Sequence, residues 1–530
     1  MGVFFDSILS DAVAIFTIVL MWLYYYLTST YSFWESRNIP YIKPQIFFGN
    51  LKDIITMKTP QCLKFNEFYN HFKGSGLSYG GIFELRKPVL LVCSPDLIKD
   101  MTVKNFAMFH DRGLEFDAEG DPLSANLLSL TGSTWKYIRS KLIPAFSTAK
   151  LNAMVTSFGE VAEPYLEHWR TIAKTGEAID VREMTAQYTT DVIGMCAFGL
   201  QLNSLGGNSN FRVMGRKILE PSTKVKILQI INNVYPWFSK IIKFRLVPSE
   251  ITDYFIGVLR ETMNYRKENK IDKNDFLNYL MKIKETKAAN LAEVDEMKGV
   301  VGYNTSTGDN NIELTENVIA AQAMIFFLAG FETTSTTLSY CMYELALNPD
   351  IQKKMKEEIR KHLKIHKEIN IEFLHDLTYS EQVIEETMRK HTAVSLILRA
   401  CTKPYKLPDS ETVLPEGTRI FIPVHSLHHD PEYFPDPEKF DPERFSPENR
   451  EKIIPYSYLP FGEGPRMCIG KRFAMLEMKT FIAKLLLHFT VVPCEKTKPV
   501  QISPKTFLLS PVDIIWLKLV ADNPSGAGDA

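Results

Sequence analysis

A cysteine between two glycines is the feature of this sequence that most directly suggests chemistry. Residues 461–470 read FGEGPRMCIG, with Gly464 four residues before Cys468 and Gly470 two residues after it. Glycine lets the backbone approach a sulfur atom closely, and a helix predicted just after the loop would direct N–H groups and positive potential at it. Both effects favour a thiolate, the form of cysteine that binds metals. The loop therefore predicts a metal-ligating cysteine, with an inert loop thiol as the alternative.

A second candidate lies inside a long apolar helix. Thr315 is predicted to cap a helix that continues until Pro349 stops it. Residues 318–330 are apolar on nearly all sides, so we expect this helix in the middle of the core. The sequence then turns to FETTSTT, and an acid followed by hydroxyls is a poor choice for a buried helix interior. Such a violation marks a candidate functional site at Glu332 and Thr333, with a solvent-exposed polar turn as the alternative.

Five motifs, in matching order and spacing, resemble those of the cytochrome P450 family. They are the Phe461–Gly470 loop, Ala329–Thr334 (AGFETT), Glu386-x-x-Arg389, Pro442–Phe445 (PERF) and Trp135-x-x-x-Arg139. The resemblance covers essentially the whole chain, and its wording is most similar to insect microsomal enzymes of the xenobiotic-metabolising group. It implies a mainly α fold with a minor β-sheet region, a haem-thiolate domain preceded by one N-terminal transmembrane helix.

The resemblance also implies a cofactor and the residues that hold it. The cofactor is haem b, with the thiolate of Cys468 as the axial ligand of its iron. Phe461 would pack on the sulfur side of the ring, while cations and an indole N–H would meet the haem propionates. The implied propionate contacts are Arg466, Arg139 and Trp135, with Arg399 and Arg112 as additions. For Arg112 and Arg399 the alternative is a solvated surface charge.

The remaining motifs are assigned to proton delivery and to structure. Glu332 would relay protons from solvent, and the Thr333 hydroxyl would donate a hydrogen bond and hold a water in a helix gap at Gly330. These two residues are the predicted catalytic pair.

Glu386 and Arg389 would be buried with Arg444 in a structural network, the alternative being an exposed pair of little energetic value. One departure follows: the family usually has proline soon after this motif, whereas residues 390–393 here read KHTA. The path of that pocket wall is therefore left open.

The N-terminus predicts a membrane anchor. No residue from Ala12 to Trp34 is charged, and a helix of that length, about 35 Å, crosses a hydrocarbon core of about 30 Å. Acidic residues precede the apolar run and basic residues follow it, which favours a cytosolic catalytic domain. The alternatives are a cleaved signal peptide, which usually begins with basic residues that are absent here, and a buried core helix. The predicted division is 1–34 anchor, 35–50 proline-containing linker, 51–522 single haem-thiolate domain and 523–530 disordered tail.

Composition limits the other possibilities. Lys plus Arg number 61 against 62 Asp plus Glu, which gives no electrostatic attraction for nucleic acid. The seven cysteines are scattered without a C-x-x-C motif, so a disulfide scaffold or cysteine-rich zinc module is not expected. The resemblance implies the endoplasmic reticulum membrane, electrons from NADPH-cytochrome P450 reductase with cytochrome b5 as a further candidate donor, and a lipophilic small-molecule substrate.

Some segments carry narrower expectations. Residues 227–244 read as an interfacial membrane surface, and residues 298–311 as a polar loop. A basic patch for a reductase is predicted at Lys136, Lys141, Lys471 and Arg472. The predicted pocket segments are Gly113–Leu130, Phe211–Pro236, Met324–Phe331, Thr392–Leu398 and Phe507–Ser510.

Three functions compete for these residues. The first is a monooxygenase that inserts one oxygen atom of O2 into an apolar substrate with electrons from NADPH. The second is a haem-thiolate isomerase or dehydratase that needs no reductase, and such relatives tend to lose the acid–threonine pair. The third is a non-catalytic haem-binding protein. Because Cys468, Glu332 and Thr333 are all retained, the sequence favours the monooxygenase.

Overall fold

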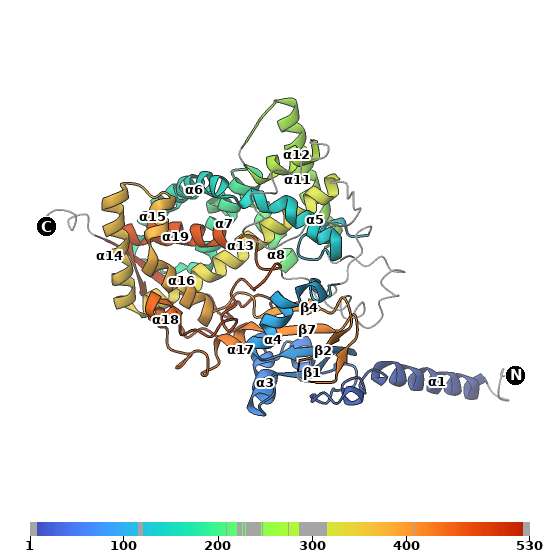
Figure 1. Ribbon diagram of the computed structural model, residues 1–530. Helices are drawn as coiled ribbons and strands as arrows, with labels where there is room; N and C mark the ends of the chain where they lie inside the picture. The colour runs from blue at the N-terminus through green and yellow to red at the C-terminus, as the bar shows by residue number, and fades with distance from the viewer. Residues whose placement is uncertain are drawn as a thin grey trace.

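A computed structural model describes residues 8–114, 120–207, 209–219, 247–273, 275–285, 315–408 and 410–522, together with residues 225, 228 and 245. Helices form most of this part of the chain, and a smaller sheet region lies on one side (Figure 1). The fold class predicted from the sequence is confirmed. The segments 298–311 and 227–244, apart from residue 228, lie outside the described residues.

The helix predicted between Thr315 and Pro349 and the helix predicted after the cysteine loop are both present, whereas the N-terminal helix ends at Thr28, six residues before Trp34. The long helices are α1 (Ile8–Thr28), α3 (Gln61–Gly74), α5 (Gly132–Leu142), α6 (Thr148–Thr175), α7 (Val181–Phe198), α8 (Asn210–Leu219), α11 (Ser249–Glu268), α12 (Phe276–Glu285), α13 (Glu316–Leu347), α14 (Pro349–His366), α16 (Thr378–Lys390) and α19 (Lys471–His488). The shorter ones are α2 (Lys52–Ile55), α4 (Pro95–Lys99), α15 (Ile371–Asp376), α17 (Val424–His428) and α18 (Pro447–Arg450).

The strands form small sheets with a mixed topology. They are β1 (Tyr79–Glu84), β2 (Lys87–Val92), β3 (Ile179–Asp180), β4 (Leu396–Ala400), β5 (Tyr405–Lys406), β6 (Val413–Leu414), β7 (Arg419–Pro423), β8 (Phe489–Pro493) and β9 (Trp516–Ala521). The main sheet has the order β1-β2-β7-β4, in which only β2 and β7 are parallel. β3, β9 and β8 form a second sheet, and β5 pairs with β6. The first sheet and its helices pack around a hydrophobic core of their own.

Helix α13 is the central element of the helical core. Thr315 caps it as predicted, with its hydroxyl accepting the N–H of Val318 at 3.3 Å. Most of its residues are buried, and it packs along α7 (Figure 1). By length and composition α13 resembles a membrane span, but its burial inside the protein identifies it as a core helix.

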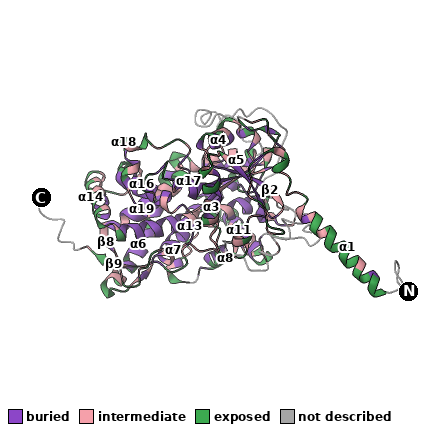
Figure 2. Cartoon of the chain, turned by 90° about the horizontal axis from the view of Figure 1, so that it is seen from below, coloured by how far each residue is buried: buried purple, intermediate pink, exposed green. Residues whose placement is uncertain are grey.

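Helix α1 stands away from the rest of the protein. It projects from the side of the main sheet and exposes large apolar side chains along its length (Figure 2). This arrangement fits a membrane-spanning helix. The helix ends at Thr28, and Trp34 is fully buried with its indole N–H donating to the Ile82 carbonyl at 3.0 Å. The division of the chain into anchor, linker and domain stays a prediction, but Trp34 packs with the sheet.

Candidate functional site

The cysteine loop has a backbone that only glycine permits. Gly464 has a φ of +72°, and a Cβ there would lie 2.0 Å from the carbonyl oxygen of Thr102. The N–H of Cys468 donates to the Phe461 carbonyl at 2.9 Å, and Gly470 caps α19 just beyond. All seven cysteines lie in the described part of the chain, and Cys468 is the one whose side chain is exposed. The loop therefore presents one thiol for ligation.

The electrostatics of Cys468 differ from the sequence expectation in one respect. The Gly470 N–H and the nearby Arg139 and Arg112 lower the pKa of the thiol, as the loop sequence predicts. Desolvation by the surrounding protein is larger, however, and the net effect raises the pKa. The protein groups alone therefore do not make the thiolate. A bound metal cation would, because it displaces the thiol proton.

Arg466, which belongs to the cysteine loop, is held in place by several contacts. Its guanidinium donates to the carbonyls of His110 at 2.7 Å, Leu127 at 3.1 Å and Leu130 at 2.5 Å. It also lies over the Trp135 ring, 4.1 Å from the ring centroid. These contacts fix an almost fully buried cation beside Trp135 on α5.

Arg466 belongs to a cluster of four neighbouring arginines. The others are Arg112, Arg139 and Arg399. Burial, together with repulsion from these neighbours, lowers the pKa of Arg466 to about 8 and that of Arg399 to about 9. Arg399 is 1% exposed, so its reading as a surface charge is wrong; Arg112 is partly buried and donates weakly to Leu128 and Arg466 carbonyls. Asp111 lies 3.8 Å from Arg466, but one carboxylate does not balance four neighbouring cations, so the cluster favours a bound anion.

The donors in this cluster point to the same conclusion. Trp135 Nε1 and Arg399 Nε are buried, and neither has a hydrogen-bond partner among the described residues. A buried donor without an acceptor is costly. Propionate carboxylates would supply both the acceptors and the negative charge. The site therefore fits haem, which Cys468 would hold through its iron and the arginines through its carboxylates.

The middle of α13 has a face that is less buried than the helix residues that follow it. Ala329 is exposed, and Ile325 and Thr333, one turn to either side, are partly exposed. Residues four apart share a helix face, so these three border one open space. The neighbouring Glu332 and Thr334 are buried. The alternative of a solvent-exposed polar turn is therefore wrong.

The predicted gap in α13 is not present. The helix is continuous through Gly330, and the Thr333 hydroxyl donates to the Ala329 carbonyl at 2.6 Å. Gly330 has a different role, because a Cβ there would lie 2.8 Å from the Cδ1 of Ile193 on α7. The glycine lets two helices approach, and the hydroxyls satisfy backbone carbonyls one turn earlier.

Glu332 points away from Thr333, toward α7. Its Oε1 accepts from Arg182 Nη2 at 2.7 Å, and the same nitrogen donates to Ser510 Oγ at 3.3 Å. The Arg182 side chain is 22% exposed and that of Glu332 is 8% exposed. A buried carboxylate is thus joined through one arginine to the surface. Arg182 was missed in the sequence because it belongs to no motif.

The glutamate–arginine motif forms a buried network. Arg389 donates to both carboxylate oxygens of Glu386, at 2.7 and 2.9 Å, and both side chains are 0% exposed. It also donates to the His428 and Pro437 carbonyls, and Arg444 lies 3.5 Å from Glu386. The alternative of an exposed pair is wrong: the network ties α16 to the irregular segment before the cysteine loop.

The unusual KHTA sequence after this motif has a structural explanation. His391 stacks on Tyr340 of α13 with ring centroids 4.4 Å apart, and its Nε2 lies 2.6 Å from Glu344 Oε1. Further along, the Leu509 N–H donates to the Ala393 carbonyl at 3.0 Å. Two of the predicted pocket segments therefore meet, without the proline that is usual here.

A buried acid on α19 was also missed. Glu477 is 0% exposed, and neither carboxylate oxygen has a hydrogen-bond partner among the described residues. Burial raises its pKa well above the usual value, although Thr334 of α13 lies close enough to oppose this. The sequence predicts α19 as a helix, but a single glutamate in it carries no signal of its burial.

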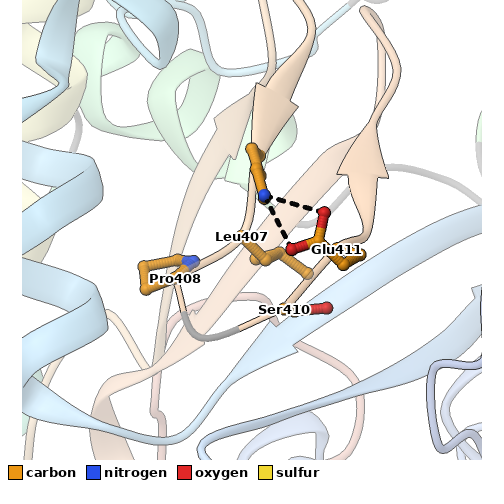
Figure 3. Close-up of a pocket in the computed structure, with 5 residues that line it drawn as sticks. Leu407, Pro408, Ser410 and Glu411 are labelled. Carbon is orange, nitrogen blue, oxygen red and sulfur yellow. Dashed lines mark hydrogen bonds and ion pairs between the residues drawn. The ribbon is translucent and has the colours of Figure 1, made fainter.

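A shallow hollow beside β5 and β6 is a separate feature (Figure 3). It is lined by Lys406, Leu407, Pro408, Ser410 and Glu411. Lys406 Nζ pairs with Glu411 at 2.9 Å, and both side chains are more than half exposed. An exposed ion pair of this kind is ordinary surface structure. The hollow has no part in the site around Cys468.

Comparison with known proteins agrees with the site. The model of the Cytochrome P450 family matches residues 40–517. The chain is 37% identical to "Probable cytochrome P450 6a13" of Drosophila melanogaster, over 96% of this chain and 98% of that protein. It is 33% identical to "Cytochrome P450 6j1" of Blattella germanica (98% and 99% covered) and to "Cytochrome P450 6A1" of Musca domestica (94% and 95%).

Proposed function

The chain belongs to the cytochrome P450 family and is therefore a haem-thiolate monooxygenase. We propose that Cys468 is the axial ligand of the haem iron and that the substrates of the enzyme are lipophilic foreign compounds. The observation that carries the ligand assignment is the pairing of one exposed thiol with four crowded arginines. No other cysteine of this chain combines exposure with such a cluster. The insect relatives support the choice of substrate class.

Three arginines of the cluster, with Trp135 and Phe461, have distinct roles in binding the cofactor. Bound haem supplies the activation of O2 with two electrons and the transfer of one oxygen atom to the substrate. Arg466, Arg399 and Trp135 would bind the haem carboxylates. Arg399 Nε and Trp135 Nε1 have no hydrogen-bond partner among the described residues and could donate to them. Arg139 donates to the Met467 carbonyl at 2.9 Å and so also holds the backbone next to Cys468. Phe461 would cover the sulfur side.

We assign proton delivery to two residues on different faces of α13. Thr333 borders the open face of the helix, where its hydroxyl could turn from the Ala329 carbonyl toward the open space and donate a proton or hydrogen bond there. Glu332 exchanges protons with solvent beside Arg182, whose side chain reaches the surface. Because the two side chains diverge, the transfer between them needs a water or a movement of Glu332.

We place the substrate pocket among the segments predicted for it, which are mostly apolar. Leu128 is 43% exposed and Phe507 is 52% exposed, although both belong to segments that the sequence assigns to the pocket. Large apolar side chains with exposed surface suit lipophilic ligands. A library of such compounds, screened by ligand-induced shifts of the haem spectrum, would identify the substrates.

The decisive assay for function is reconstitution with NADPH-cytochrome P450 reductase. A monooxygenase consumes NADPH and forms product when reductase and substrate are present, with cytochrome b5 tested as a second donor. An isomerase or dehydratase would convert a peroxide substrate without reductase. A haem-binding protein without activity would do neither, and either of these results would reject the proposal.

The reductase would dock on a basic surface around the start of α19. Lys136, Lys471 and Arg472 are exposed there, and Lys141 is partly exposed. Charge complementarity mainly accelerates association and is weakened by salt. Lys471→Glu with Arg472→Glu should therefore lower the reduction rate and blunt its salt dependence. Lys403→Glu, an exposed lysine before β5, is the matched control; equal rates in both variants would place the docking surface elsewhere.

We place the protein in the endoplasmic reticulum membrane, with α1 as the anchor and the catalytic domain in the cytosol. Removal of residues 1–28 tests this placement, because it deletes α1 and spares Trp34, which is buried against the main sheet. The shortened protein should keep haem and lose most membrane association. Tight binding that persists would indicate a second membrane contact, for which residues 227–244 are the candidate.

A further inference from the structure

Two histidines and an aspartate lie together at the end of α14, outside the site described above. His362 and His366 are one turn apart on the same face of α14, and Asp376 is the last residue of α15. Their potential ligand atoms all lie within 4.8 Å of one another. This is the one such group of metal-ligand side chains among the described residues.

The distances suit a tetrahedral metal ion. Ligand atoms about 2.1 Å from zinc are about 3.4 Å apart at the corners of a tetrahedron. Asp376 Oδ2 lies 2.8 Å from His366 Nε2 and 3.7 Å from His362 Nδ1, values on either side of that spacing. Small side-chain movements would therefore bring all three atoms to the same ion.

One of the three ligand atoms lacks a partner of its own. His362 Nδ1 is buried, and it has no hydrogen-bond partner among the described residues. A buried polar atom in this position is costly unless something binds it. His366 and Asp376, in contrast, share a hydrogen bond. That bond gives both of these side chains a hydrogen-bond partner but leaves His362 Nδ1 without one among the described residues.

We propose that His362, His366 and Asp376 form a binding site for a divalent transition-metal ion, with Zn²⁺ as the best fit. Two imidazoles and a carboxylate, with water in the fourth position, are ordinary zinc ligands. The negative end of the α14 dipole, which lies at its last turn, favours a cation there. The side chains of His362, His366 and Asp376 are 19%, 17% and 46% exposed, which gives the ion access from solvent.

Zinc at this site would join α14 to α15. α15 is in turn fastened to α19, because Lys479 Nζ of α19 donates to the Leu374 carbonyl at 2.9 Å; the same nitrogen pairs with Glu381 of α16 at 2.6 Å. Zinc should therefore raise the thermal stability of the folded protein, since a ligand that binds only the folded state stabilises it. It should leave the haem spectrum unchanged, because none of the three residues contacts the assigned haem site.

The test is zinc binding to the full-length, haem-loaded protein without an affinity tag. Equilibrium dialysis against buffered Zn²⁺, with metal analysis, should show about one more equivalent in the wild type than in His362→Ala/His366→Ala. Asp376→Asn should weaken binding by about tenfold or more. His375→Ala is the matched control, because His375 is an exposed neighbour outside the group, and its zinc content should equal that of the wild type.

A second measurement keeps the proposal testable if a variant is less stable. Added Zn²⁺ should raise the melting temperature of the wild type and of His375→Ala, but not that of Asp376→Asn. Equal zinc binding by wild type and the double variant would overturn the proposal. An equal loss in His375→Ala would overturn the ligand set, and zinc binding without any melting shift would overturn the proposed link between the helices.

Discussion

Thr333→Ala is the substitution that most sharply separates a catalytic from a structural role for α13. The side chain lies on the open face of the helix and loses only its hydroxyl and one methyl group. Its single hydrogen bond goes to the Ala329 carbonyl one turn earlier, at 2.6 Å. If Thr333 is only structural, its loss should affect folding. If it delivers protons, its loss should affect the reaction.

The structure allows the folding effect to be worked out. Loss of the hydrogen bond costs about 0.5–1.5 kcal/mol. The gain in helix propensity from threonine to alanine, roughly 0.6 kcal/mol, offsets much of this. The free energy of unfolding should therefore change by less than about 1 kcal/mol. Haem content and substrate binding should stay close to those of the wild type.

The effect on the reaction should be larger. A hydrogen bond to a charged group contributes about 1.5–3 kcal/mol, and 1.4 kcal/mol is a factor of ten in a ratio. If Thr333 guides protons to reduced oxygen, its loss should lower the ratio of product to hydrogen peroxide by about 10- to 100-fold. NADPH should still be oxidised, so the assay measures product and peroxide per NADPH.

Three further variants make the comparison decisive. Thr333→Ser keeps the hydroxyl and should keep most of the coupling. Thr337→Ala removes the same kind of bond one turn later, from a buried threonine to the Thr333 carbonyl at 3.0 Å, and should not uncouple the reaction. Thr334→Ala should also uncouple less than Thr333→Ala. Wild-type coupling in Thr333→Ala would refute the assignment.

Three further outcomes follow from the buried groups. Trp135→Phe should speed haem loss to an apo-acceptor by about tenfold or more, since a donor to a carboxylate is removed; an unchanged rate would contradict the contact. Arg389→Lys should lower the free energy of unfolding by about 3 kcal/mol or more, measured by denaturation and haem content, because a lysine cannot bind Glu386 and two carbonyls together. Glu477 has a folded-state pKa raised above its usual 4.5, so stability should fall as pH rises from that value. Glu477→Gln should flatten this slope by up to about 1.4 kcal/mol per pH unit; an identical slope in both proteins would rule out a protonated Glu477.

The sequence predicts the elements more fully than their contacts. Helix α13 and its Thr315 cap can be predicted because periodicity and capping are local properties. The burial of Glu386 and Arg389 was predicted only through the family resemblance, since their spacing alone fits an exposed pair equally well. The role of Gly330 could not be predicted, since it depends on Ile193 of another helix approaching it.

The same reason explains the residues that were missed. Arg182 and Glu477 lie in no motif, and only the packing of α7, α13 and α19 gives them partners or burial. The net pKa of Cys468 likewise depends on desolvation, which adds up over the whole surroundings. The local sequence shows which charged and N–H groups lie near Cys468 in the chain, but not whether they outweigh desolvation in setting its pKa.

The ferrous–CO spectrum of Cys468→Ala tests the central claim most directly. If Cys468 supplies the thiolate, the variant should lose the red-shifted CO band of thiolate-ligated haem, and its oxygenase activity with it. Cys494→Ala, the one other cysteine that is not buried, should keep both. Survival of the red-shifted band in Cys468→Ala would contradict the account, because another residue would then be the ligand.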